Sequence, residues 1–285
     1  MPYQNTIEKA VTYTGTGLHS GQKVTITLHP APADTGIVFR RTDLPGMPEV
    51  EAAAANVTST IRATTIENGA VRIFTIEHLL SAIHALQIDN CLIEIDAEEP
   101  PVGDGSALLF FELLLQAGIS SQKEKRQEIV IDQVYRIDDG DRFVMVLPYD
   151  GFRVSFTSLN PHPLIGVQYG DYPVDTDVYR KEIAPARTIA YEAEISALKE
   201  MGLGLGGTFE NVIVYNDNGW LNELRFADEL VRHKILDVIG DLRLAGVIRG
   251  HVIAVKSGHA LNTALAKKIS AAFAAQKISG REAKA

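Results

Sequence analysis

Apolar and polar residues alternate through the first part of the chain, and this alternation predicts β-strands. Val24, Ile26 and Leu28 fall on one face of a strand. From Ile76 the apolar residues follow the i, i+3, i+4, i+7 spacing of an amphipathic helix, which we predict over 76–87. The next two elements are an apolar strand and an apolar helix, at 91–95 and 106–117.

The second half of the chain also predicts a mixture of strands and helices. A hairpin is expected from FVMVLPYDGFRVSF, residues 143–156, because its Asp150-Gly151 pair is a strong turn signal. The further elements, in chain order, are a helix, a strand, a long helix, a strand and a final helix, at 190–201, 211–215, 226–244, 251–255 and from 260.

The two halves resemble each other in the order of their elements. Each carries a helix, an apolar strand, a glycine-containing loop and a second helix, so that His78 corresponds to His233 and Ser106 to His259. Similar spacing in the same order indicates duplication and two α+β domains that face one cleft.

We place the boundary between these domains in the segment SSQKEKRQE, residues 120–128, which has no apolar face and is interpreted as a linker. The predicted domains are therefore an N-terminal one at 1–122 and a C-terminal one at 129–280.

Composition narrows the class of protein. The chain has 285 residues with 36 Asp+Glu and 27 Lys+Arg, a formal net charge of −9, which argues against nucleic-acid binding. The single cysteine, Cys91, excludes an internal disulfide framework and multi-cysteine metal sites. Without a run of about 18 apolar residues or a signal-peptide pattern, we expect a cytoplasmic protein with no stable membrane insertion.

The long helix at 226–244 carries candidate metal ligands. His233 and Asp237 are spaced i, i+4 nearly opposite the apolar stripe, so their side chains project from one patch, and Gly240 beside them permits close approach of a backbone or substrate. A neutral imidazole and a carboxylate fixed by one helix form a good pair of zinc ligands. The alternative is an ordinary solvated pair, since i, i+4 polar pairs are common.

The helix at 76–87 begins with Glu77 and His78, which lie off its apolar stripe. In a purely structural interpretation, Glu77 favours the helix dipole and Thr75 is the N-cap. In a chemical interpretation, His78 is a third ligand and Glu77 acts on water. A His₂Asp set leaves the fourth position open, as a catalytic zinc requires.

Two further segments of interest contain glycine. His259 follows Ser257-Gly258 at the start of the last helix and is either a surface histidine or an acid, for which Asp241 is the candidate anionic partner. The segment GLGLGG, 202–207, has the letters of a dinucleotide-binding pattern. It follows a helix and precedes a strand, the reverse of the required context, so we interpret it as a tight loop.

Several long motifs in one order make the chain resemble the UDP-3-O-acyl-N-acetylglucosamine deacetylase family, the zinc amidases of lipid A biosynthesis. The resemblance covers nearly the whole length. Its motifs are TGTGLHSG (14–21), TGIVFRR (35–41), TIEHLLSAIHAL (75–86), GDGSA (103–107), ARTI (186–189), LGGTFENVIV (205–214), VRHKILDVIGDL (231–242) and KSGHALN (256–262). The implied fold is α+β: two similar domains in a sandwich, each a small mostly antiparallel sheet, with helices packed at the inter-domain interface.

Carried over residue by residue, the resemblance implies one Zn²⁺ per chain, with Fe²⁺ possible in the cell. Its ligands would be His78, His233 and Asp237. The implied catalytic residues are a general base, a cationic acid, the residue that orients this acid and two groups that stabilise the oxyanion, which are Glu77, His259, Asp241, Lys234 and Thr188.

The resemblance also implies an apolar passage for the acyl chain, formed by an insert in the second domain. Its residues would be Ile189, Tyr191, Ile195, Gly207 and Thr208, and Arg142 would contact the diphosphate. Ile189, Gly103 and Asn160 depart from the family's usual Phe, Met and aromatic residue. These departures leave open the acyl-chain preference and the way in which the uridine end is held.

The implied reaction is zinc-dependent hydrolysis of the N-acetyl group of UDP-3-O-acyl-N-acetylglucosamine, giving UDP-3-O-acyl-glucosamine and acetate, the committed step of lipid A biosynthesis. The implied partner is this UDP-sugar with its acyl chain, and we expect a monomer. Two alternatives stay open: a zinc amidase of the same fold acting on another acylated amino sugar, and a non-catalytic module that binds sugar nucleotides or lipids.

Overall fold

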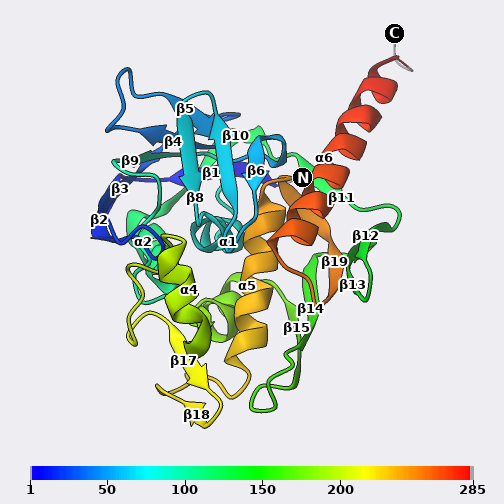
Figure 1. Ribbon diagram of the computed structural model, residues 1–285. Coiled ribbons are helices and arrows are strands. Elements are labelled where there is room, and N and C mark those ends of the chain that lie inside the picture. Colours follow the sequence, from blue (N-terminus) through cyan, green and yellow to red (C-terminus); the bar gives the residue numbers. More distant parts are fainter. Residues whose placement is uncertain (1, 283–285) are drawn as a thin grey trace.

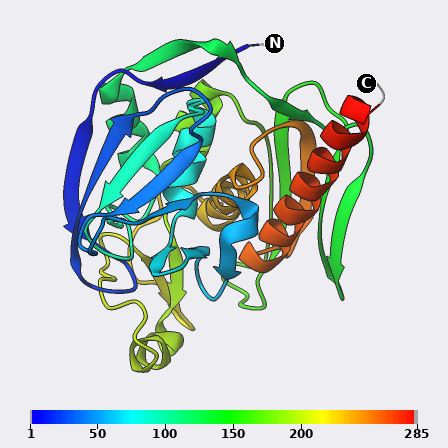
Figure 2. The same cartoon turned by 90° about the horizontal axis from the view of Figure 1, so that it is seen from above.

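The computed structural model describes residues 2–282 and consists of two α+β halves that face each other (Figure 1). Each half contains one larger sheet, and helices from both halves lie between the two sheets when the molecule is seen from above (Figure 2). The predicted fold class is therefore confirmed: the protein is α+β, with two similar, mostly antiparallel sheets and helices packed where the halves meet.

The sheet of the first half has five strands in the order β2-β3-β9-β4-β5. Their bounds are β2 Val11–Thr16, β3 Lys23–Pro30, β4 Ile37–Arg41, β5 Glu49–Glu51 and β9 Cys91–Ile95. The central strand, β9, is antiparallel to β3 and parallel to β4. The predicted alternation is confirmed, because Val24, Ile26 and Leu28 are all buried.

The sheet of the second half repeats this order as β12-β13-β19-β14-β15. Its strands are β12 Tyr135–Asp139, β13 Arg142–Leu147, β14 Phe152–Leu159, β15 Val167–Pro173 and β19 Val247–Val255, with β11 Glu128–Val130 parallel to the start of β19. The central strand is again antiparallel to one neighbour and parallel to the other. Identical strand order in both halves supports the predicted duplication.

The hairpin expected at 143–156 is wrong. β13 and β14 are not paired with each other, because β19 lies between them: Ala254 is the partner of Val144 on one side and of Phe156 on the other. The turn at Asp150-Gly151 does reverse the chain, but it connects two strands that lie on either side of β19. β19 takes the central place since its apolar sequence buries every second residue and forms ladders with both neighbours.

The segment 120–128, expected as a linker, is mostly strand. β10 Ile119–Lys125 pairs antiparallel with β1 Tyr3–Ile7 at the edge of the first half. This pairing satisfies backbone donors and acceptors and requires no apolar face, which is why the side-chain pattern did not indicate it. The division into domains at 1–122 and 129–280 stays a prediction.

The helices are α1 Glu77–Ala85, α2 Leu108–Ala117, α3 Thr176–Val178, α4 Ile195–Glu200, α5 Glu229–Arg243 and α6 His259–Glu282, with 3-10 turns at Ala54–Asn56 and Glu192–Glu194 and a π turn at Tyr179–Ile183. Within residues 2–282, no helix combines the length and the hydropathy needed to cross a bilayer.

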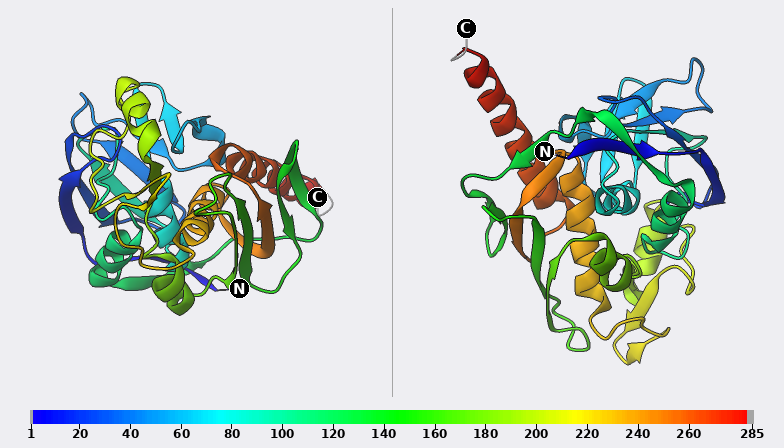
Figure 3. Two further views of the ribbon diagram at one scale, coloured as in Figure 1. Left: turned by 60° about the horizontal axis from the view of Figure 1, so that its bottom comes forward. Right: turned by 180° about the vertical axis from the view of Figure 1, so that it is seen from behind.

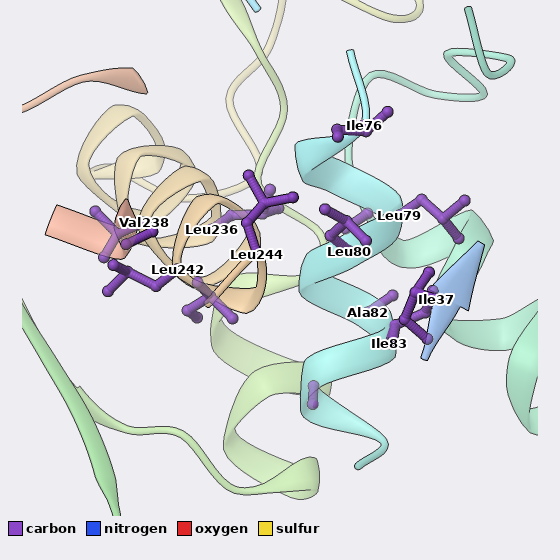
Figure 4. Packing of buried hydrophobic residues seen from close by; sticks show 14 of the residues in the cluster. Ile37, Ile76, Leu79, Leu80, Ala82, Ile83, Leu236, Val238, Leu242 and Leu244 are labelled. Carbon is purple, nitrogen blue, oxygen red and sulfur yellow. The ribbon is translucent and has the colours of Figure 1, made fainter. Parts of the chain in front are cut away.

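α1 and α5 form the contact between the halves. All nine residues of α1 are buried, because the helix lies between its own sheet and α5. Figure 4 shows Leu80 pointing from α1 toward α5, Leu79 and Ile83 pointing toward the first sheet, and Val238 on the side of α5 that faces away from α1. The predicted apolar stripe of α5 is buried throughout: Val231, Ile235, Val238, Ile239 and Leu242.

The close approach predicted at Gly240 is confirmed. A Cβ atom at this position would lie 2.0 Å from the backbone oxygen of Glu77, so only glycine allows the two helices to meet there. This contact brings the start of α1 against the last turns of α5.

Each half carries a small insert before its interface helix. The first is the sheet of β6 Val57–Ser59, β7 Thr65–Asn68 and β8 Val71–Phe74. The second is the sheet of β16 Ile189–Tyr191, β17 Ile213–Asn216 and β18 Gly219–Trp220, with α4. The second insert lies at the end of the sandwich away from the far end of α6 (Figure 3). The helix expected at 190–201 is thus shorter, because its first residues form β16.

Candidate metal and catalytic site

Three residues from the facing helices converge at the contact between the halves. His78 comes from the start of α1, and His233 and Asp237 come from successive turns of α5. Their candidate ligand atoms all lie within 4.8 Å of one another, and all three residues are buried. The two imidazole rings meet edge to face, with centroids 5.0 Å apart. The structure therefore brings together the three residues predicted as ligands.

The chemistry of this cluster fits a divalent cation. Oδ1 of Asp237 is buried without a hydrogen-bond partner in the described part of the chain, an arrangement that is unfavourable unless a cation or water satisfies it. His233 donates from Nδ1 to the backbone carbonyl of Ala186 at 3.1 Å, which turns its Nε2 toward the cluster. Burial lowers the pKa of His78 to about 3 and also lowers the pKa of His233, so both imidazoles stay neutral, as metal ligands must be.

A second group of charged side chains lies directly beside the cluster. Oε1 of Glu77 is 3.7 Å from Nε2 of His259, which in turn donates from Nδ1 to Oδ2 of Asp241 at 2.9 Å. Asp241 is fully buried and Glu77 nearly so. The structure thus places the predicted base, the predicted acid and the residue expected to orient the acid in one chain of contacts.

These surroundings raise the pKa values of both Glu77 and His259. Burial raises the pKa of Glu77 to about 7, against the opposing charge of His259. Burial also disfavours charge on His259, but the nearby Asp241, Glu77 and Asp237 outweigh it and raise its pKa to about 10. At neutral pH His259 is therefore cationic, and Glu77 is poised to exchange a proton.

Lys234 and Thr188, predicted to stabilise an oxyanion, line the same pocket as the cluster. Nζ of Lys234 donates to Oδ2 of Asp237 at 2.8 Å, and although burial opposes its charge, Asp237 raises the pKa of this ammonium group. The carboxylate thereby keeps Lys234 charged at the edge of the site. Thr188 is held by backbone hydrogen bonds to Gly105 and Ile213, from the loop before α2 and from β17.

A pocket of about 570 Å³ extends from this chemical group into the second insert. Its walls are largely apolar: Leu18, Ile189, Ile195, Leu198, Val212 and Val214. Of the residues expected to form an acyl passage, Ile189, Ile195, Gly207 and Thr208 line it. The pocket therefore combines apolar walls with the catalytic-type side chains Glu77, Lys234 and His259.

Two of the expected substrate contacts lie elsewhere. The Tyr191 ring packs against His162 and Tyr215 on the other face of the insert sheet, and its hydroxyl donates to Asp217 at 2.5 Å. Arg142 begins β13 at the turn after β12, where it pairs with Asp139. Neither residue lines the pocket: Tyr191 packs in a separate cluster with Tyr215 and Trp220, and Arg142 lies at the turn between β12 and β13.

Thr75 is not the N-cap of α1, as the sequence suggested. The cap position is Ile76, and Thr75 adopts a left-handed φ of 57° with its hydroxyl donating to Glu99 at 2.9 Å. The same Glu99 carboxylate accepts from the backbone N–H of His19 and Ser20. Glu99 therefore connects the loop at 17–20 by hydrogen bonds to Thr75, which lies just before Glu77 and His78 in the chain.

Sequence reasoning missed Thr64, Glu99 and Asn262. All three are buried, and each bonds to the catalytic-type residues or to the segments that carry them. Thr64 and Glu99 lie in none of the quoted motifs, and Asn262 ends KSGHALN without a role assigned to it, so only the packed structure reveals these contacts. His19, in the motif TGTGLHSG, also lines the pocket.

The fold and the site define a class of α+β protein in which two similar halves gather a His-His-Asp donor set at their contact. This chain belongs to the family described as LpxC, UDP-3-O-acyl N-acetylglycosamine deacetylase, whose model matches residues 4–271.

Individual proteins with the name UDP-3-O-acyl-N-acetylglucosamine deacetylase are similar over nearly their whole lengths. The protein of Marinobacter nauticus is 45% identical over 273 residues, which are 94% of this chain and 90% of the relative. That of Anaeromyxobacter dehalogenans is 44% identical over 278 residues, 96% of this chain and 90% of the relative. That of Pseudomonas entomophila is 46% identical over 273 residues, with shares of 94% and 90%.

Proposed function

We propose that this protein hydrolyses the N-acetyl group of UDP-3-O-acyl-N-acetylglucosamine in a zinc-dependent reaction that releases acetate, as a step of lipid A biosynthesis. The observation that carries the proposal is the convergence of His78, His233 and Asp237 within 4.8 Å of one another, beside Glu77 and His259. The names of the similar proteins supply the substrate.

His78, His233 and Asp237 would hold the zinc ion, and their buried position keeps competing water away from them. When bound, zinc lowers the pKa of water and polarises a carbonyl oxygen. A set of two imidazoles and one carboxylate is typical of catalytic zinc sites, because it leaves room for a fourth ligand.

Glu77 and His259 would move the protons. Glu77 takes a proton from the water that attacks the acetyl carbonyl carbon, for which its pKa of about 7 is well matched to neutral pH. His259, held cationic by Asp241, donates a proton to the departing glucosamine nitrogen. The amide bond breaks, acetate leaves, and the free amine remains on the sugar.

Lys234 and the hydroxyl of Thr188 would stabilise the charge that develops on the carbonyl oxygen. Both residues line the pocket that His259 and Glu77 also line. A positioned cation and a positioned hydroxyl are most effective where the charge increases between ground state and transition state.

The apolar part of the pocket, beside the second insert, would accept the 3-O-acyl chain. Ile189, Ile195 and Leu198 supply branched aliphatic side chains, and Gly207 and Thr208 also line the pocket. Burial of methylene groups contributes about 0.8 kcal/mol each, so a chain of matching length adds substantial binding energy.

The decisive experiment measures acetate release from UDP-3-O-acyl-N-acetylglucosamine by protein that is loaded with zinc, stripped by a chelator, or reloaded. We expect turnover that disappears on chelation and returns with zinc. His233→Ala should abolish both turnover and retained zinc, whereas His29→Ala, on the outer face of the first sheet, should change neither.

A panel of acylated amino sugars with different acyl lengths separates the alternatives. Turnover of another acylated amino sugar in preference to the UDP-linked substrate would favour a different amidase of the same fold. Tight binding of the UDP-sugar by zinc-loaded protein without any acetate would instead indicate a binding module and refute the enzymatic proposal.

A further inference from the structure

We propose that Thr64 is a positioning residue, which fixes the carboxylate of Asp241 against His259 and assigns separate tasks to the two oxygens of Glu77. This inference rests on the proposed function. Thr64 directly precedes β7 in the first insert. Arg62, two residues earlier, has a left-handed backbone conformation with a φ of 62°. The residue is fully buried between the two halves.

Thr64 contacts both carboxylates of the site with two different donors. Its backbone N–H donates to Oε2 of Glu77 at 3.1 Å, and its hydroxyl donates to Oδ1 of Asp241 at 2.5 Å. Glu77 belongs to α1 and Asp241 to α5, so this one residue bridges the helices of opposite halves. A donor placed between two like charges stabilises both and reduces their mutual repulsion.

The hydroxyl completes the set of donors around Asp241. Oδ2 accepts from Nδ1 of His259 and from Nδ2 of Asn262, both at 2.9 Å. Oδ1 of Asp241 accepts from the hydroxyl of Thr64, which is its one hydrogen-bond donor in the described part of the chain. Since Asp241 is fully buried, bulk water cannot replace this bond, and the carboxylate is locked in the rotation that presents Oδ2 to His259.

The backbone bond has a separate consequence for Glu77. Because Oε2 is held by Thr64, the oxygen that faces His259 is Oε1, at 3.7 Å from Nε2. Oε1 is therefore the oxygen available to accept a proton from water. Thr64 in this way aligns the base and the acid together, although it is not among the residues that line the pocket.

Substitutions separate the two bonds. Thr64→Val keeps the shape and the backbone N–H but removes the hydroxyl, so it isolates the bond to Asp241. We expect kcat to fall roughly ten- to a hundred-fold, as for loss of a buried hydrogen bond to a charged group, with KM changed less than about two-fold and zinc content unchanged. Thr64→Ser retains the hydroxyl and should keep kcat within about three-fold of the unaltered protein.

Two controls test whether the loss of kcat in Thr64→Val acts through Asp241. Thr65→Val removes a neighbouring buried hydroxyl that makes no hydrogen bond to either carboxylate within residues 2–282, and it should leave kcat unchanged. In an Asp241→Asn background, Thr64→Val should lower kcat by less than about two-fold further, because residues that act through one another are not additive. If Thr64→Val does not fold, Thr64→Ala compared with Thr64→Ser provides the same one-hydroxyl difference.

A second readout does not depend on turnover. In NMR spectra of the zinc-loaded protein, the Nδ1 proton of His259 should exchange with water roughly ten-fold faster in Thr64→Val than in Thr64→Ser. Unchanged kcat in Thr64→Val, an equal loss in the Asp241→Asn background, or a loss that follows zinc content would each overturn the proposal. If the unaltered protein releases no acetate, the proposed function fails, and the exchange rates alone then decide the role of Thr64.

Discussion

Replacing Asp241 by Asn tests whether a buried carboxylate keeps His259 cationic. The substitution preserves the shape of the side chain and an oxygen that can accept from His259, but it removes a full negative charge 2.9 Å from the imidazole. In the proposed reaction His259 must be protonated to donate to the leaving nitrogen, so activity should be lost as the pH rises through its pKa. A lower pKa therefore moves the alkaline limb of the kcat/KM profile to lower pH.

The size of this shift follows from the geometry. Asp241 is fully buried, and at an effective dielectric constant of about 20 two unit charges about 4 Å apart interact by about 4 kcal/mol. This energy corresponds to about three pKa units, and opposite charges at such distances shift pKa values by about 1 to 3 units in proteins. Since Glu77 and Asp237 remain to support the cation, we expect the alkaline limb to move down by about 1 to 3 pH units.

The assay is kcat/KM for acetate release between about pH 5 and 11, with zinc content and melting temperature measured for each protein. Because both proteins hold the same ion, its charge affects both profiles alike and cancels from the comparison. The matched control is Glu94→Gln, which removes a carboxylate paired with His29 at 3.0 Å on the outer face of the first sheet. An Asp241→Asn profile with its alkaline limb unmoved would refute this account of His259.

Three further substitutions test the rest of the site. Glu77→Gln should retain zinc by elemental analysis and lose about 10²- to 10⁴-fold in kcat, the contribution of a general base; near-normal turnover would exclude that role. Asp237→Ala should lose its zinc on dialysis, and full retention would show that the cation is held elsewhere. Gly240→Ala should lower the free energy of unfolding by about 1 to 3 kcal/mol in urea titrations, because its Cβ would lie 2.0 Å from the backbone oxygen of Glu77, and unchanged stability would contradict this close approach.

Side-chain periodicity predicted the elements that bury one face. The helix beginning at Ile76 and the strand at 91–95 appear as α1 and β9, and the stripe through Val231 and Leu242 is buried as expected. These features depend on local spacing and on burial, both of which are encoded directly in the order of apolar residues.

Features set by backbone pairing were not predictable in the same way. The polar segment at 120–128 forms most of β10 because Tyr3–Ile7 offers an unpaired edge, which no side-chain pattern reports. The turn at Asp150-Gly151 was identified, but its strands are separated by β19, a strand that follows almost a hundred residues later. Likewise, the hydrogen bonds of Thr64 to Glu77 and Asp241 depend on the packing of α1 against α5, which side-chain periodicity does not report.

The duplication explains why the site lies at the contact between the halves and why it is nevertheless asymmetric. The predicted duplication matches His78 on α1 with His233 on α5, and their rings meet across the interface. It matches His259 with Ser106, which lies before α2 and whose hydroxyl donates to Asp104 at 2.7 Å. One half thus carries the proposed acid, His259, and the other carries the proposed base, Glu77. Because neither half contains a complete set, the chemistry proposed here requires both helices packed together, and the glycine at the crossing point is part of that requirement.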